Sequence, residues 1–209
     1  MKKSLLKIKI NEISKYLKSE KALDAVGILI QELTSYEEPQ EKSIDTSSLP
    51  LPNEVRSKTN AYALYTDGAC RGNPGPGSYA FIVQNHEGEI VGQGAEAVSL
   101  TTNNKMEMSA IINGLKFLST EVSPMNEIYI FTDSKYVVDG MRSWIHNWKK
   151  KGWKKADNKA PENVDLWKEL DSLSNICHMS FNWIKGHAGH PQNEHVDKMA
   201  NVVLDENGY

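Results

Sequence analysis

Two short apolar runs that each end in Thr-Asp constrain the fold of this chain more than any other feature. The first covers residues 62–65 and leads to Asp67, and the second covers residues 128–131 and leads to Asp133. β-Branched and aromatic residues favour strands, so each aspartate is expected at the carboxyl end of a strand. If the two strands are parallel neighbours, both carboxylates reach the same edge of a sheet, where open α/β sheets place their sites.

Two carboxylates at one sheet edge indicate a cation site. Two unit charges about 4 Å apart repel by roughly 4 kcal/mol at an effective dielectric constant near 20, so the pair needs a proton or a metal ion. Oxygen ligands of this kind suit Mg²⁺ or Mn²⁺. The segment after Asp67, residues 68–77, is rich in Gly and Pro and is expected to be a loop.

The rest of the chain from residue 60 predicts one mixed domain. The element order is βββαβα, two further helices, then βα, which is typical of an α/β or mixed α+β domain. Besides the two runs above, the predicted strands cover residues 78–83, 89–98 and 179–184, and the predicted helices cover residues 102–120, 134–141, 163–175 and 192–204.

Composition limits the class of protein. With 209 residues, 39% of them hydrophobic, the chain can bury one substantial core and a small appendage. It has no apolar run of about 20 residues and no secretory leader pattern, so a cytoplasmic protein without a membrane role is expected. Its two cysteines, Cys70 and Cys177, have no metal-ligand spacing. The net charge of −3 excludes a protein held on nucleic acid by bulk charge alone.

The N-terminal part follows a different pattern. Residues 1–36 predict two short amphipathic helices, and residues 37–59, with three prolines and several serines, predict a linker. The helices would form either a cap or an interaction module for a partner protein or a second copy of the chain. Their apolar stripes consist of Leu6, Ile10, Ile13 and Leu17, then Leu23, Val26, Ile30 and Leu33.

Six motifs together resemble bacterial type 1 ribonuclease H between residues 61 and 200. They read, in chain order, YTDGACRGNPGPG, TTNNKMEM, FTDSKYV, WIHNWKKKGW, NVDLW and WIKGHAGHPQNEHVD. The resemblance implies a five-stranded mixed sheet of order 3-2-1-4-5 flanked by helices. It also implies Mg²⁺-dependent endonucleolytic cleavage of the RNA strand of RNA/DNA hybrids, leaving 5′-phosphate and 3′-hydroxyl ends. The first 60 residues lie outside it.

The same resemblance assigns the site residues. The implied metal ligands are Asp67, Glu107, Asp133 and Asp197, and the mobile-loop histidine is His187. Sensing of the RNA 2′-hydroxyl falls on the loop from Cys70 to Asn73, on Asn104 and on Glu107. Contacts to the DNA strand fall on Thr102, Asn163, Trp144, Lys149, Lys150 and Lys151.

Phosphodiester hydrolysis by such a site would use two divalent ions about 4 Å apart. Asp67 is expected to bridge them, with Glu107 and Asp133 on one ion and Asp197 on the other, while His187 carries a proton that helps product leave. Three alternatives are a binding module without catalysis, another nuclease or integrase of the same superfamily, and a protein that only interacts through its N-terminal helices.

Overall fold

The computed structural model describes residues 10, 14, 16–35 and 49–209, and the chain divides into two compact units, Met1–Ile44 and Asp45–Tyr209. In the first unit, helix α2 (Glu20–Ser35) contains the residues of the second predicted stripe. Val26 and Ile30 on its predicted stripe are half-buried, whereas Leu23 is exposed. Of the earlier stripe, Leu6 and Ile13 lie outside the described residues.

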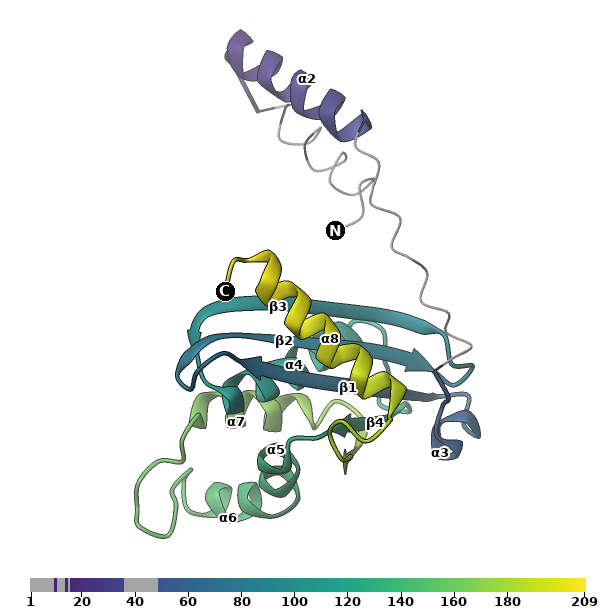
Figure 1. The fold of residues 1–209 in the computed structure, drawn as a ribbon, viewed down its shortest axis with the longest axis vertical. Helices are drawn as coiled ribbons and strands as arrows, with labels where there is room; N and C mark the ends of the chain where they lie inside the picture. Colours follow the sequence, from purple (N-terminus) through teal and green to yellow (C-terminus); the bar gives the residue numbers. More distant parts are fainter. Residues whose placement is uncertain (1–9, 11–13, 15, 36–48) are drawn as a thin grey trace. The chain divides into compact units, whose positions relative to one another are not determined.

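A five-stranded mixed sheet forms the centre of the second unit (Figure 1). The strand order β3-β2-β1-β4-β5 confirms the predicted topology. β1 pairs antiparallel with β2 and parallel with β4, and β4 pairs parallel with β5. The strands are β1 (Ala61–Cys70), β2 (Gly75–Asn85), β3 (Ile90–Thr101), β4 (Glu127–Thr132) and β5 (His178–Trp183).

The segment expected to be a Gly- and Pro-rich loop is mostly strand. β1 continues to Cys70 and β2 starts at Gly75, with Gly68 opposite Tyr79 in the ladder. A Cβ on Gly68 would lie 2.3 Å from the backbone nitrogen of Glu107. The glycine is therefore needed for close packing against the next helix, and it does not mark the end of the strand.

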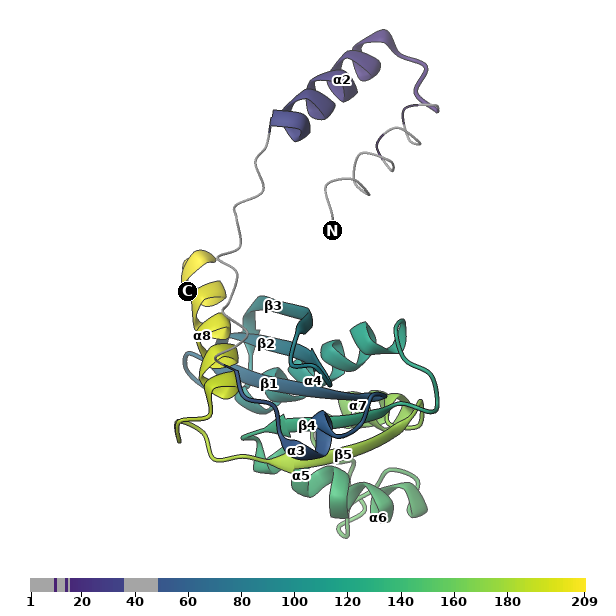
Figure 2. The same cartoon turned by 90° about the vertical axis from the view of Figure 1, so that its right-hand side faces the viewer.

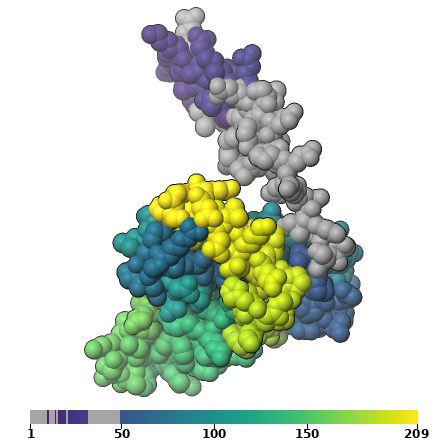
Figure 3. Space-filling model, in the orientation of Figure 1, coloured from purple at the N-terminus to yellow at the C-terminus, as the bar shows by residue number. Residues whose placement is uncertain are grey.

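Helices cover both faces of the sheet. α4 (Asn103–Ser119) and α7 (Val164–Leu173) lie on one face, and α8 (Pro191–Glu206) lies across the other (Figures 1 and 2). In the space-filling view, α8 crosses the outer surface of the unit (Figure 3). None of the helices in the described part of the chain combines the length and apolar character that crossing a bilayer requires.

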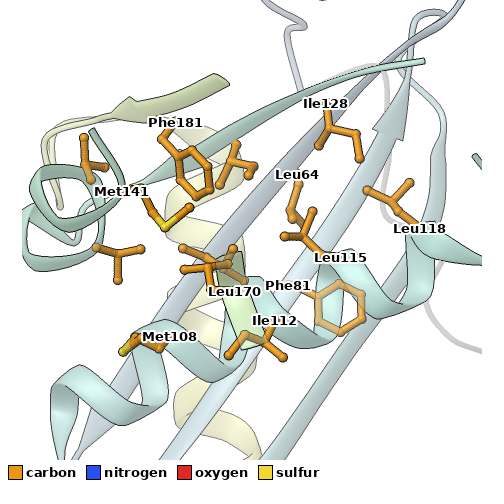
Figure 4. Close-up of a cluster of buried hydrophobic side chains, with 14 of the residues drawn as sticks. Leu64, Phe81, Met108, Ile112, Leu115, Leu118, Ile128, Met141, Leu170 and Phe181 are labelled. Carbon is orange, nitrogen blue, oxygen red and sulfur yellow. The ribbon is translucent and has the colours of Figure 1, made fainter. Parts of the chain in front are cut away.

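A cluster of buried apolar side chains lies between the sheet and the helices on the α4 side (Figure 4). Leu64 of β1 is fully buried, and a Cβ on Gly114 of α4 would lie 2.5 Å from its Cδ1. The sheet and helix therefore approach closely at that point. Other members of the cluster are Phe81, Met108, Ile112, Leu115, Leu118, Ile128, Met141, Leu170 and Phe181.

The region after β4 is one continuous helical path. α5 (Lys135–Asp139) passes through a π-helical turn, η2 (Gly140–Trp144), into α6 (Ile145–Lys150). The rings of Trp144 and Trp148 have centroids 5.8 Å apart. Both also contact the ring of Trp167, which is fully buried. These tryptophans anchor the basic segment to the core.

The predicted linker, residues 37–59, differs from the structure at its C-terminal end. Leu49 and Leu51 are buried, and a short helix, α3 (Asn53–Arg56), buries Val55 completely. α3 lies beside β1. Three apolar side chains among prolines and polar residues formed no regular stripe, which is why composition alone indicated a linker.

Candidate active site

Two aspartates meet at the carboxyl end of the parallel strand pair, as the sequence indicated. Thr66 of β1 pairs with Thr132 of β4, so Asp67 and Asp133 each occupy the next position along neighbouring strands. Asp67 is 9% exposed, and Asp133 is half-buried just beyond the end of β4. The register of the sheet thus places both carboxylates at one edge.

Glu107 joins them from the second turn of α4. The close approach of α4 to Gly68 places this turn against β1. Two side chains then hold the carboxylate: Nδ2 of Asn103 donates to Oε1 at 2.7 Å, and Oγ of Ser134 donates to Oε2. The Glu107 carboxylate is therefore oriented before any ligand binds.

Asp197 approaches from the opposite face of the sheet, on α8. Nδ2 of Asn201 donates to its Oδ1 at 3.1 Å. α8 is fixed to the sheet beyond this point by the Ser78 hydroxyl, which donates to the carbonyl of Ala200 at 2.6 Å. The four predicted carboxylates thus come from the interior of β1, the end of β4 and two helices.

Electrostatics show that the four groups are neighbours. Burial, followed by the charges of Asp133 and Asp197, raises the pKa of Asp67 from 3.8 to about 7, although the Gly68 amide opposes this and Glu107 adds to it. A carboxylate surrounded by three others holds its proton because its ionised form would be poorly solvated and repelled.

Glu107 and Asp133 are perturbed in the same direction. Burial raises the pKa of Glu107, while the hydrogen bond from Ser134 opposes the rise. Burial also raises the pKa of Asp133, opposed first by Asn193. Asn193 is 2% exposed, and neither atom of its amide has a hydrogen-bond partner of full geometry. A buried unpaired amide beside carboxylates is an unusual arrangement that a ligand would complete.

The carboxylates interact without converging on one point. Among the described residues, no three Cys, His, Asp or Glu side chains stand close enough together to hold a metal ion as they are. Mutual repulsion keeps like charges apart until a cation or protons neutralise them. The donor set itself, carboxylate oxygens with a nearby amide, fits hard divalent cations such as Mg²⁺ or Mn²⁺.

The loop before α8 brings His187 to the same edge. Gly186 lies so near Asp133 that a Cβ there would be 2.4 Å from Oδ2. His187 is exposed with φ 51°, and its charge lowers the pKa of Asp133. Gly189 follows with φ 80°. An imidazole on an exposed, glycine-flanked loop can reach a substrate bound over the carboxylates.

The predicted RNA-sensing residues border this edge. Sγ of Cys70 donates to the carbonyl of Gly72 at 2.7 Å, and Oδ1 of Asn73 accepts from the backbone amide of Asn103 at 3.3 Å. The loop is thereby attached to the start of α4. Thr102 occupies the N-cap position of α4 without a side-chain cap bond, and Asn104 is half-buried in the first turn.

The basic and aromatic side chains form a separate surface on α6 and the following loop. A hollow of about 550 Å³ there is lined by Trp144, Asn147, Trp148, Lys151, Lys154, Lys155 and Ala156. Lys150 is exposed, whereas Nζ of Lys149 pairs with Asp171 at 2.8 Å. Asn163, with φ 56°, donates from Nδ2 to the hydroxyl of Tyr136 at 3.3 Å.

Sequence reasoning missed several contributors. Ser134 was expected only at the start of a helix, yet it caps α5 and also holds Glu107. Asn193 and Lys154 were not singled out at all. Ser134 follows Asp133 directly, which was a usable signal, whereas the placement of Asn193 depends on how α8 packs across the sheet.

The comparisons with known proteins agree with this arrangement. The RNase H family model matches residues 59–204. The chain is 49% identical over 140 residues to Ribonuclease HI of Neisseria meningitidis serogroup B, covering 66% of this chain and 91% of the relative. It is 45% identical over 153 residues to Ribonuclease H of Pectobacterium carotovorum, covering 70% and 94%.

Solved structures show the same fold. The crystal structure of LC9-RNase H1, described as a type 1 RNase H with the type 2 active-site motif, matches with a TM-score of 0.63 and 32% identity, covering 71% of this chain and 74% of that one. LC11-RNase H1 in complex with an RNA/DNA hybrid matches with a TM-score of 0.55 and 23% identity, covering 70% and 98%.

Proposed function

Because this chain belongs to the bacterial type 1 ribonuclease H family, we propose that it hydrolyses the RNA strand of RNA/DNA hybrids endonucleolytically. We further propose that cleavage depends on two Mg²⁺ ions, which Mn²⁺ can replace, and leaves 5′-phosphate and 3′-hydroxyl ends. A solved relative of the same fold is described in complex with an RNA/DNA hybrid.

The observation that carries this proposal is the effect of three carboxylates on a fourth. Asp67 is buried within β1, beside the end of β4, and in addition to burial the charges of Asp133, Asp197 and Glu107 all raise its pKa. Like charges gathered in this way are costly for stability, so their retention indicates a ligand that neutralises them. A purely structural surface would place carboxylates in water or opposite lysines.

In the proposed site, Asp67 would serve both divalent ions, Glu107 and Asp133 would help to hold one, and Asp197 would help to hold the other. When bound, divalent ions supply Lewis acidity and neutralise charge at the phosphate. Asn103 and Ser134 orient Glu107, so its oxygens need little rearrangement.

The remaining residues handle protons and substrate. His187, exposed on its loop, transfers a proton near the scissile phosphate and aids product release. Selection of RNA would use the 2′-hydroxyl, which donates and accepts hydrogen bonds, against Cys70, Asn73, Asn104 and Glu107.

Affinity for the DNA strand is assigned to a different part of the surface. Thr102 and Asn163 would hold a phosphate, and Trp144 with the lysines at 149–151 would contact the backbone. Such contacts weaken with salt and read no base sequence. The exposed side chain at position 100 is a leucine, Leu100, 72% exposed, which has no charge with which to bind this phosphate.

The N-terminal part has a separate proposed role. Residues 1–36 would form a helical module that binds a partner protein or a second copy of the chain, joined by a linker to the catalytic domain in a cytoplasmic protein. Leu23, Ile28 and Leu29 on α2 are 45–58% exposed, which supports an interaction role for this helix.

The decisive experiment compares cleavage of end-labelled substrates in Mg²⁺. The unmodified chain should cut the RNA of a hybrid and leave double-stranded RNA and DNA intact. Asp67→Asn should retain hybrid binding and lose cleavage. Products should be substrates for ligation without added kinase, which reports a 5′-phosphate. Cutting of duplex DNA would instead favour another nuclease of the superfamily, and binding by the unmodified chain without any cleavage would favour a binding module.

A further inference from the structure

A short segment ahead of the family match packs against the catalytic domain. Residues 49–56, here called the strap, precede residue 59, where the match to the family begins. Leu49 and Leu51 of the strap are each 6% exposed, and Val55 is fully buried. The strap is therefore part of the folded domain in this chain, although it lies outside the region that matches the family.

The strap reaches α8 through two buried amide side chains. Nε2 of Gln192 donates to the carbonyl of Pro50 at 2.6 Å and to Oε1 of Gln84 at 3.2 Å. Nε2 of Gln84 in turn lies 3.5 Å from the carbonyl of Leu49. Gln192 is 3% exposed and Gln84 is fully buried. Losing one partner of such a buried group leaves the other unsatisfied, so the contact fixes the Gln192 side chain.

A small shift of Gln192 would also displace residues of the candidate active site. It is the second residue of α8, directly before Asn193, which is buried against Asp133. Asp197 lies on the same helix little more than one turn later, and the loop carrying His187 leads into its first turn. Because a helix moves as a rigid unit, the position of this turn determines where these groups stand.

We propose that Gln192 is a positioning residue, through which the strap holds the first turn of α8 in the geometry that hydrolysis requires. This inference rests on the proposed function, and it adds a segment outside the matched family region to the catalytic apparatus. The Pro50 carbonyl of the strap accepts a hydrogen bond from the Gln192 side chain, and this bond fixes the start of α8 relative to the strap.

The test uses the full chain and steady-state cleavage of a hybrid in Mg²⁺, at a temperature where every variant is folded. Gln192→Met keeps the side-chain length and removes the donor. It should lower kcat about tenfold and leave KM for the hybrid within about twofold, since the lysine surface is untouched. Leu118→Ala, a fully buried site at the far end of α4, is the control. It should lower the Tm and leave kcat unchanged.

A double-mutant cycle separates positioning from general stability. Leu51→Ala removes a buried side chain of the strap and leaves the Gln192 side chain unaltered, and it should lower kcat in the same way. Combined with Gln192→Met, it should add little, because both changes release the same contact. Fully additive effects on kcat, or a fall in Tm with kcat unchanged in both single variants, would overturn the proposal.

Hydrogen exchange on the metal-free protein provides a readout that does not depend on cleavage. Gln192→Met should reduce protection of the backbone amides from residue 194 to 197, and unchanged protection would refute the strap contact alone. Absence of hybrid cleavage by the unmodified chain would refute both the proposed function and the effect of Gln192 on catalysis. The hydrogen-exchange result would still test whether the strap fixes α8.

Discussion

Replacing Asp67 with Asn should stabilise the metal-free protein while abolishing cleavage. The Asp67 carboxyl group is 9% exposed, and burial with the neighbouring carboxylates raises its pKa from 3.8 to about 7. At 1.36 kcal/mol per pH unit, this difference of about 3 units corresponds to at most about 4 kcal/mol. Asn removes the ionisation and keeps nearly the same shape.

The sign follows from proton binding in the two states. Between pH 4 and pH 7 the unfolded chain has released the Asp67 proton while the folded chain retains it, so the free energy of unfolding of the unmodified protein falls as pH rises. The increase in the free energy of unfolding caused by Asp67→Asn should therefore be near zero at pH 4 and reach its full value above pH 7. Urea unfolding in EDTA at a series of pH values measures it.

Two controls complete this experiment. Glu206→Gln alters an exposed carboxylate at the end of α8 and should change stability by no more than about 0.5 kcal/mol at any pH. Mg²⁺ at about 100 times its Kd should stabilise the unmodified protein by about 2.7 kcal/mol and Asp67→Asn by much less. Parallel pH profiles for the unmodified protein and Asp67→Asn would refute the argument that the carboxylates form one repelling cluster.

Four other changes have defined outcomes. His187→Ala should lower kcat in hybrid cleavage by about 10²-fold or more and leave the Mg²⁺-induced rise in Tm unchanged; an unaltered pH–rate profile would remove this residue from proton transfer. Changing the lysines at 149–151 to Gln should reduce the salt dependence of hybrid binding by about two phosphate contacts, because one of them pairs with an aspartate, and an unchanged slope would place the hybrid elsewhere. Gly140→Ala should destabilise by about 1–3 kcal/mol in urea unfolding, because its Cβ would lie 2.1 Å from Cη2 of buried Trp167. Gly27→Ala, with no described atom within 4 Å of its Cβ, should be neutral or stabilising by up to about 1 kcal/mol, and equal tolerance at both glycines would contradict the packing.

Local sequence patterns were sufficient for the elements and for the positions of two carboxylates. The runs leading to Asp67 and Asp133 lie in β1 and β4 because aromatic and β-branched side chains fit the pleated, buried surface of a sheet. The apolar period of the helix carrying Glu107 likewise gave α4 to within a residue or two at either end. The strand order, by contrast, was available only through the family resemblance.

Local reasoning failed where distant parts of the chain decide the outcome. Residues 68–77 contain the glycines and prolines typical of a loop, yet most of them pair in a ladder. The glycine at position 68 is needed because α4 packs too closely there for a side chain. The strap has the composition of a linker and is buried through Leu49 and Leu51. Lys149, within a run that suggested free positive charge, is held by Asp171.

The sequence by itself determined which residues could do chemistry: oxygen ligands at strand ends, a histidine between glycines, and lysines among tryptophans. Only the tertiary structure decided how those groups behave, because a pKa depends on burial and on charges that are remote along the chain. Asp67 has a raised pKa first because the fold buries it, and then because Asp133, Asp197 and Glu107 are brought near it from β4, α8 and α4. Gln192 likewise contacts Pro50 only after the strap and α8 have folded together.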